Sequence, residues 1–291
     1  MNPAQLLALF DRISDAPDAI PRLRKFILDL AVRGKLAEQD PRDEPASELL
    51  KRIQGEKERL VKAGGVRNLN PFPKVETDEV PFSSPPGWEW VRIRQVTNDR
   101  GQVEPKDSFT YIDVTAINKE LGRIDDAKVL SASDAPSRAR KLVKKGDVLY
   151  SCVRPYLLNI AVVEHEIVPP PIASTAFAVL NGFGLVLSRY LWIVLRSPLM
   201  VESVEGKMRG QAYPAINDSA FAQLPFPLPP LPEQHRIVTK VDELMALCDR
   251  LEVAQAERES RRDRLVASSL NRLNNGADAD AFRDHAHFYF N

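Results

Sequence analysis

The chain has 291 residues, enough for one large domain or two modest ones, and its 44% hydrophobic and 27% charged residues are ordinary for a globular protein. Its 40 basic and 40 acidic residues balance, which argues against a protein that coats nucleic acid through a global positive field. Any contact with DNA must therefore come from local basic patches.

The cysteine and hydropathy patterns bear on the compartment. Cys152 and Cys248 lie far apart and match no metal or redox spacing, which predicts two reduced, buried thiols. No apolar run reaches the roughly 20 residues of a membrane span, and the first residues lack a basic segment followed by an apolar stretch. We therefore predict a cytoplasmic protein with no membrane association.

Proline clusters divide the sequence into five regions and predict an α+β protein. Residues 1–64 are predicted to be an N-terminal helical block, because apolar residues recur at helical spacing from Leu23 and again after Ser47. Gly34 is predicted to end the first of these helices. Residues 65–86 are predicted to be an extended, proline-rich linker.

Residues 87–230 are predicted to form a mixed α/β domain, because short β-prone runs alternate with turns there. The clearest runs are 88–91, 111–114, 147–150 and 160–163. A single helical segment around 188–200 is expected to interrupt them. The block has an ordinary size for one domain.

Residues 231–273 are predicted to be one long helix, because neither proline nor glycine follows Glu233 in this stretch. A helix of about 40 residues is a rod roughly 60 Å long. Its apolar positions step by four and three residues, which is typical of a coiled-coil seam, and we expect the amino-terminal helices to cover it. The predicted seam and docking surface comprises Ile237, Val241, Leu244, Cys248 and Leu251. The seam weakens beyond Leu251, and residues 274–291 are a C-terminal tail.

Motifs for catalysis are missing from the sequence. An Asn-Pro-Pro-aromatic motif, which would hold a flipped base for methylation, does not occur, nor does the G-x-x-x-x-G-K-[ST] phosphate loop. The four histidines show no H-E-x-x-H spacing, and no cluster of carboxylates completes a nuclease motif. We therefore predict no catalytic residue, no metal site and no cofactor in this chain, and the sequence indicates a binding module.

Two stretches of the domain carry the residue types that contact DNA. Residues 137–154 form its densest basic run, for which we predict phosphate contacts, although a solvated surface is the plainer alternative. Residues 206–217 form a glycine-containing loop with two cations and with amide side chains that suit adenine edges. The predicted DNA-binding residues are Arg138, Arg140, Lys141, Lys144, Lys145, Arg154, Tyr156, Lys207, Arg209, Gln211, Tyr213 and Asn217.

Several segments resemble one known family. Residues 228–252 read LPPLPEQHRIVTKVDELMALCDRLE and closely resemble the helical spacer of type I restriction-modification specificity subunits. The runs LAVRGKL (30–36) and DEPASELLKRI (43–53) match the amino-terminal block of that family. GWEWV (87–91), GDVLYSCVRP (146–155) and ASTAF (173–177) resemble parts of its target recognition domain.

The resemblance implies a subunit without catalysis of its own. Its recognition domain would bind one half of a split target in double-stranded DNA, and its helices would hold methyltransferase subunits and, through them, the restriction subunit. S-adenosylmethionine, ATP and Mg are then expected in those partner subunits. Two other classes stay open: a self-sufficient DNA methyltransferase or nuclease, and a coiled-coil scaffold without DNA binding.

The chain departs from the family in carrying one recognition domain where usual members carry two. Two explanations follow from the resemblance. The first is a natural half-subunit that forms a homodimer with C2 symmetry and reads a symmetric, interrupted site. The second is a piece of a longer subunit.

Overall fold

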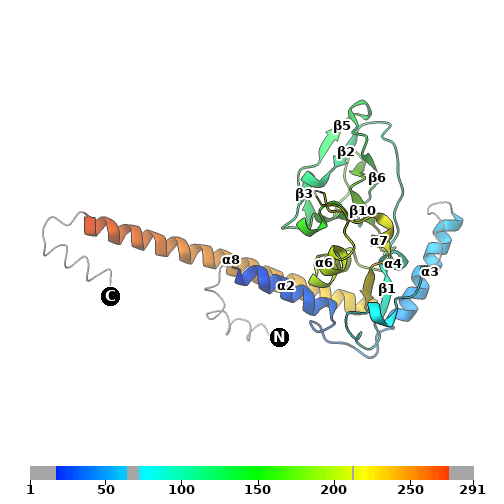
Figure 1. The fold of residues 1–291 in the computed structure, drawn as a ribbon, viewed down its shortest axis with the longest axis horizontal. Helices are drawn as coiled ribbons and strands as arrows, with labels where there is room; N and C mark the ends of the chain where they lie inside the picture. Colours follow the sequence, from blue (N-terminus) through cyan, green and yellow to red (C-terminus); the bar gives the residue numbers. More distant parts are fainter. Residues whose placement is uncertain (1–17, 64–71, 212, 275–291) are drawn as a thin grey trace. The chain divides into compact units, whose positions relative to one another are not determined.

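A computed structural model describes residues 18–63, 72–211 and 213–274 of the chain (Figure 1). The protein divides into two compact units: one is Lys25–Asp242, and the other combines Met1–Arg24 with Glu243–Asn291. The structure has mixed α+β architecture, with amino-terminal helices, a strand-rich centre and a long carboxy-terminal helix, so the predicted fold class is confirmed. The predictions made for residues 1–17, 64–71 and 275–291 lie outside the described residues.

Two amino-terminal helices occupy the predicted positions, α2 (Ala19–Val32) and α3 (Ala46–Lys62). Gly34 follows α2 with φ +65°, where a β-carbon would lie 2.5 Å from Cγ of Pro85. A left-handed backbone and a close approach by the linker therefore both require glycine at the end of this helix, as predicted.

The centre of the chain folds into two main sheets (Figure 1). One has the order β10-β7-β8, from Phe177–Leu180, Val148–Ser151 and Ile160–Val162, and all its pairs are antiparallel. The other has the order β5-β2-β9-β6, from Lys128–Leu130, Phe109–Ile112, Pro171–Ser174 and Ala139–Leu142, and only β2 and β9 run parallel. A small hairpin of β3 (Ile117–Asn118) and β4 (Arg123–Ile124) contacts β8.

One core joins these sheets. Leu149, Phe177 and Val179 of the first sheet pack in the same buried cluster as Ile112 and Ala173 of the second. Strands β7 and β10 are buried at every residue, so they read as continuous apolar runs rather than as alternating ones. Four short 3₁₀ helices lie in the connections: η1 (Thr77–Glu79), η2 (Val114–Ala116), η3 (Ala132–Asp134) and η4 (Pro155–Leu157).

The prediction of a single helical segment in the domain is wrong. Helix α5 (Ser188–Arg196) ends before Ser197, and α6 (Pro198–Glu205) begins directly after it. Pro198 cannot donate a backbone hydrogen bond and so opens a new helix, while the Ser197 side chain accepts from the amide of Met200 as its cap. Two short helices were also missed, α4 (Ile93–Val96) and α7 (Asp218–Ala222), which contact one another.

The two ends of the domain pair with each other at its base. Strand β1 (Glu89–Arg92) runs antiparallel to β11 (Pro225–Leu228), so the segment that enters the domain lies beside the segment that leaves it. The prolines of β11 lack an N–H group, which suits them to a two-stranded ribbon with free edges. The chain between residues 93 and 224 therefore begins and ends at the same strand pair, β1–β11.

The long helix α8 spans Leu231–Asn274, as the uninterrupted helical pattern predicts (Figure 1). Ile237, Val241, Leu244 and Cys248 of the predicted apolar seam are buried, and Leu251 is partly buried. In the unit that contains both residues, Arg24 of α2 forms ion pairs with Asp249 (2.7 Å) and Glu252 (2.8 Å) of α8. This agrees with the expectation that an amino-terminal helix accompanies the seam.

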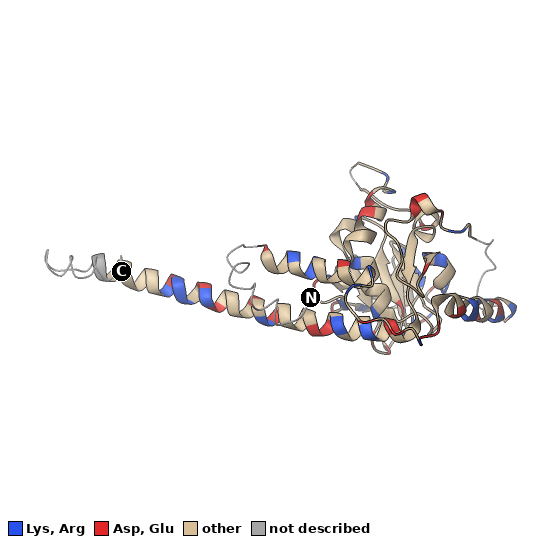
Figure 2. Cartoon of the chain, turned by 90° about the horizontal axis from the view of Figure 1, so that it is seen from below, with Lys and Arg blue, Asp and Glu red and all other residues tan. Residues whose placement is uncertain are grey.

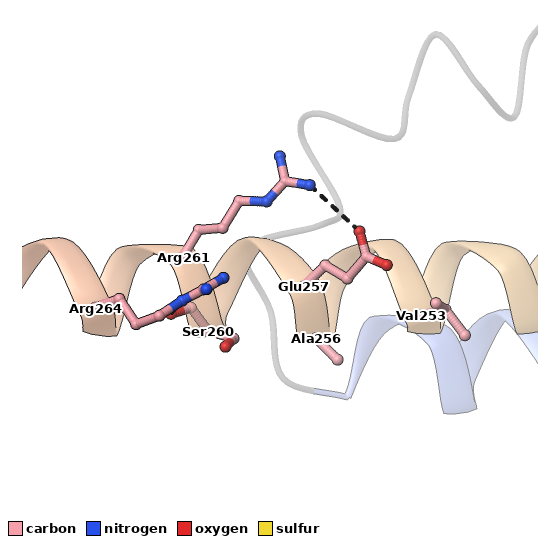
Figure 3. Close-up of a pocket in the computed structure, with 6 residues that line it drawn as sticks. All are labelled: Val253, Ala256, Glu257, Ser260, Arg261 and Arg264. Carbon is pink, nitrogen blue, oxygen red and sulfur yellow. Dashed lines mark hydrogen bonds and ion pairs between the residues drawn. The ribbon is translucent and has the colours of Figure 1, made fainter.

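Beyond the seam, α8 changes character. Val253, Leu265, Val266 and Leu270 are exposed, and acidic and basic side chains alternate along the helix (Figure 2). Figure 3 shows a surface hollow on this part, lined only by α8 residues that include Val253, Ser260 and an ion pair between Arg261 and Glu257 (3.5 Å). The distal part of α8 is thus an apolar and charged helix surface within the described residues.

Glu233 in the first turn of α8 gives a pH-dependent prediction. Its carboxylate is buried and accepts a hydrogen bond from Nε1 of Trp88 (2.8 Å), and burial raises the pKa of this carboxyl. An acid whose pKa is higher in the folded state loses part of its stabilising contribution as pH rises through that pKa. Glu233→Gln keeps the acceptor and removes the charge, so we expect a higher free energy of unfolding than wild type at neutral pH.

The advantage of Glu233→Gln should shrink as pH falls, because protonation neutralises the wild-type carboxyl as well. Urea denaturation of both proteins across the acid-to-neutral range measures the difference. A difference that grows on acidification would contradict the assignment. Glu243→Gln, at an exposed position of the same helix, is the control for removing an acidic charge.

Candidate DNA interface

The predicted recognition loop folds into a hairpin. Arg209 and Ala215 exchange two backbone hydrogen bonds of 2.9 Å each, and Gly210 between them adopts φ +93°. The side chains of Lys207, Arg209, Gln211 and Tyr213 are exposed on or next to this hairpin. The backbone pair of Arg209 and Ala215 therefore closes the hairpin, and four predicted DNA-binding residues are exposed to solvent on or next to it.

The hairpin is attached to the end of strand β7. Ile216 donates its backbone N–H to the carbonyl of Cys152 (3.0 Å), and Arg154 donates its own to Pro214 (2.8 Å). The Arg154 guanidinium lies over the ring of Tyr213, 4.7 Å from the ring centre. Tyr156 is exposed in η4, directly after Arg154. The structure thus brings residues of two distant sequence segments, 154–156 and 207–213, to one end of the domain.

Arg138 joins this end through the turn between β9 and β10. Strand β6 begins where β9 ends, strand β7 ends where β10 begins, and the exposed Thr175 lies between them. The amide of Thr175 donates to the carbonyl of Arg138 (2.9 Å), and that of Cys152 donates to the carbonyl of Ala176 (2.8 Å). Residue type alone does not single out Thr175, because its run, residues 173–177, indicates only a strand that resembles one in the family.

The basic run 137–154 does not form one patch. Lys144 and Lys145 are exposed in the turn between β6 and β7, at the opposite end of β7 from Arg154. The register explains this separation, because Leu142 pairs with Ile172 and Val148 pairs with Leu180, away from the Thr175 turn. Any DNA contact of Lys144 and Lys145 must therefore lie apart from the hairpin.

Three predicted residues have other partners. Lys141 is buried and its ammonium pairs with Asp99 (2.8 Å) and Asp218 (3.6 Å). The Asn217 side chain caps α7 by accepting from the amide of Ala220 (2.8 Å). Arg140 is half-buried and donates to the carbonyl of Ala139 (2.9 Å). The ion pairs of Lys141 and the cap formed by Asn217 give these two side chains structural roles, and Arg140 stays a predicted DNA contact.

Hydrogen bonds to Arg92 hold linker residues 73–79 against the domain. The buried Arg92 donates to the carbonyls of Pro73 (3.2 Å) and Lys74 (2.9 Å) and to the carboxylate of Glu79. The hydrogen bonds from the Arg92 side chain and from the backbone amide of Glu76 lower the pKa of Glu79 to about 2, and the charge of Lys207 contributes to the lowering. Lys207 therefore lies near Glu79 of the linker as well as next to the hairpin.

The remaining chemistry of the described residues is structural. Both cysteines are buried, as predicted, and burial raises the pKa of Cys152 to about 12, so its thiol is unreactive. Within 18–63, 72–211 and 213–274, no group of three His, Cys, Asp or Glu side chains is placed to hold a metal ion. In the same ranges, no helix has the length and apolar character to cross a membrane.

Comparison with known proteins agrees with this geometry. Residues 140–258 match the model of the type I restriction modification DNA specificity domain. The chain is 32% identical to the type I restriction enzyme EcoAI specificity subunit of Escherichia coli and 31% identical to the EcoEI specificity subunit of the same species. Each alignment of 268 residues covers 90% of this chain and 45% of the relative, so the chain spans about half the length of the curated relatives it matches.

Solved structures show the same likeness. The HsdS subunit from Thermoanaerobacter tengcongensis superposes with a TM-score of 0.61 at 35% identity, over 69% of this chain and 54% of that one. A chain from a structure described as showing complex assembly and conformational transition of the type I R-M system gives a TM-score of 0.60 at 34% identity, over 68% and 53%. The matched domain, the curated relatives and the solved folds agree: the chain carries a DNA specificity domain of the type I restriction-modification kind and is similar to about half of a specificity subunit.

Proposed function

We propose that this chain binds double-stranded DNA in a sequence-specific manner and recognises one half of a split target for a type I restriction-modification complex. The observation that carries the proposal is the hairpin, which presents Arg209, Gln211 and Tyr213 beside Arg138 and Arg154 at one end of a domain matched by the DNA specificity model. Arginine suits guanine edges and glutamine suits adenine edges, whereas Arg138 and Lys207 suit phosphates.

The same proposal assigns the partners. The chain has no catalysis of its own, and α8 with the amino-terminal helices docks the methyltransferase subunits, which connect to the restriction subunit. S-adenosylmethionine, ATP and Mg belong to those partners. We further propose that the distal part of α8 pairs with a second copy of this chain, because it exposes the large apolar side chains of Val253, Leu265 and Leu270 among alternating charges (Figure 2). Two copies would read a symmetric, interrupted site.

One sedimentation experiment tests both parts. The full chain, with the methyltransferase subunit of its own system, is centrifuged with a labelled duplex that carries the motif found by methylation mapping, at increasing salt. We expect two copies of the chain per complex and a DNA affinity that falls with salt, since displaced phosphate counterions make binding salt-dependent. Binding that does not depend on salt, or no binding, overturns the DNA proposal. A monomer both alone and in the complex overturns the pairing.

A variant pair separates pairing from folding. Leu265→Gln with Leu270→Gln removes two exposed apolar side chains of distal α8 and should yield a single copy. Val168→Gln, at a valine that is 88% exposed in the domain, is the matched control and should leave two copies. Loss of pairing in both variants would show that Leu265 and Leu270 have no special role.

A further inference from the structure

Tyr213 is held in an unusual way for an exposed side chain. It is 70% exposed, yet one face of its ring lies against the Arg154 guanidinium at 4.7 Å. The backbone that follows Tyr213 is fixed, because Arg154 donates to the carbonyl of Pro214 (2.8 Å) and Ile216 donates to that of Cys152 (3.0 Å). The open face and edges of the ring therefore point to solvent with a set orientation.

Arg154 is itself constrained. Its backbone is left-handed, with φ 48° and ψ 55°, and its carbonyl accepts from the amide of Leu157 (3.0 Å) in the turn of η4. A non-glycine residue adopts this conformation only when its surroundings impose it, and such residues are common where a side chain must be aimed. The η4 turn therefore fixes the position of the Arg154 guanidinium over the Tyr213 ring.

The ring has neighbours of complementary chemistry. Arg209 and Gln211 on the same hairpin suit the hydrogen-bonding edges of guanine and adenine. Neither suits the C5-methyl of thymine, the one apolar group that a base presents in the major groove. A pre-oriented aromatic ring buries such a methyl at small entropic cost, because few torsions remain to be fixed.

We infer that Tyr213 reads a thymine by contact with its C5-methyl group, and that Arg154 is a positioning residue that holds the ring for this contact. The inference rests on the proposed DNA binding and deepens it. It changes the role predicted for Arg154, whose charge then acts through the tyrosine ring.

The test removes only the methyl group. Cognate duplexes are prepared in which each thymine of the half-site, on either strand, is replaced singly by uracil, and their affinities are measured with the full chain and its methyltransferase. Wild type should lose about fourfold at one position, the effect of burying one methyl group. Tyr213→Phe should keep this discrimination, and Tyr213→Ala should bind the thymine and uracil duplexes equally.

Arg154→Lys tests the positioning role. Lysine keeps the charge and loses the planar stacking on the ring. The salt dependence of binding should therefore stay as in wild type while the thymine-to-uracil ratio falls toward one. Arg189→Lys is the matched control, because Arg189 also stacks on an aromatic ring, that of Trp192 (4.1 Å), and lies outside the proposed interface; it should keep the ratio.

The outcomes separate the inference from the proposed function. If no duplex binds with salt-dependent affinity, the proposed function fails. If the duplexes bind but no uracil position is weaker, or if Tyr213→Ala keeps the discrimination, DNA binding stands and the thymine contact is wrong. If Arg154→Lys keeps the wild-type ratio, the positioning role is wrong.

Discussion

Replacing Arg209 by alanine is expected to weaken binding to the cognate duplex by about 1–3 kcal/mol, roughly 5- to 150-fold, the discrimination that one bidentate base contact supplies. The hairpin should survive, because the hydrogen bonds that close it join the backbones of Arg209 and Ala215 and do not involve the lost side chain. The same reasoning applies to Gln211→Ala. Random duplex should lose much less, since phosphate contacts dominate its binding.

The control for Arg209→Ala is Lys144→Ala. Lys144 lies at the other end of β7, so any contact it makes is with phosphates, and its loss should weaken cognate and random binding alike. Competition binding with both duplexes at two salt concentrations distinguishes the classes. Equal losses on both duplexes for Arg209→Ala, Gln211→Ala and Lys144→Ala would remove the claim that the hairpin reads bases.

Replacing Asp147 by alanine is expected to lower the free energy of unfolding by about 3–5 kcal/mol, the cost of breaking a buried ion pair from one side. The fully buried carboxylate accepts from Nε of Arg100 (2.7 Å), the amide of Lys144 (2.8 Å) and Nδ2 of Asn181 (3.0 Å). It therefore ties the β6–β7 turn to two other segments. Its loss leaves a guanidinium and two donors without their shared acceptor.

Asp126→Ala provides the matched comparison, because this aspartate is exposed and its loss should change stability by less than about 0.5 kcal/mol. Urea denaturation followed by circular dichroism measures both variants. A small effect of Asp147→Ala would mean that water replaces the carboxylate without cost, and the turn would then need another explanation for its order.

Much of the fold could be predicted from local pattern. The long helix followed from a stretch without proline or glycine, and Gly34 marked a helix end that needs a left-handed residue. The break between α5 and α6 was missed because the apolar spacing continues through Ser197 and Pro198. In the sequence alone, a proline that opens a new helix, such as Pro198, looks the same as a proline within one longer apolar segment.

The site could be predicted only as residue types. Lys141 and Lys144 are three residues apart in one basic run, yet one is buried on Asp99 and the other is exposed in a turn. Lys141 lies within β6 and Lys144 follows that strand in a turn, and the acidic partner of Lys141 is distant in sequence, so charge pattern alone cannot tell the two lysines apart. Thr175 reaches the site through strand register, which a single sequence does not reveal.

The pairing of β1 with β11 has a consequence for how this protein changes over time. Since one two-stranded ribbon closes the path of residues 93–224, those residues behave as an insert whose ends meet, and insertions of this kind are readily exchanged. Point changes or whole replacements within the insert can then alter which bases are read while the flanking helices keep their sequence. The strand pair β1–β11 is in this sense a junction at which recombination can exchange the domain between proteins of different specificity.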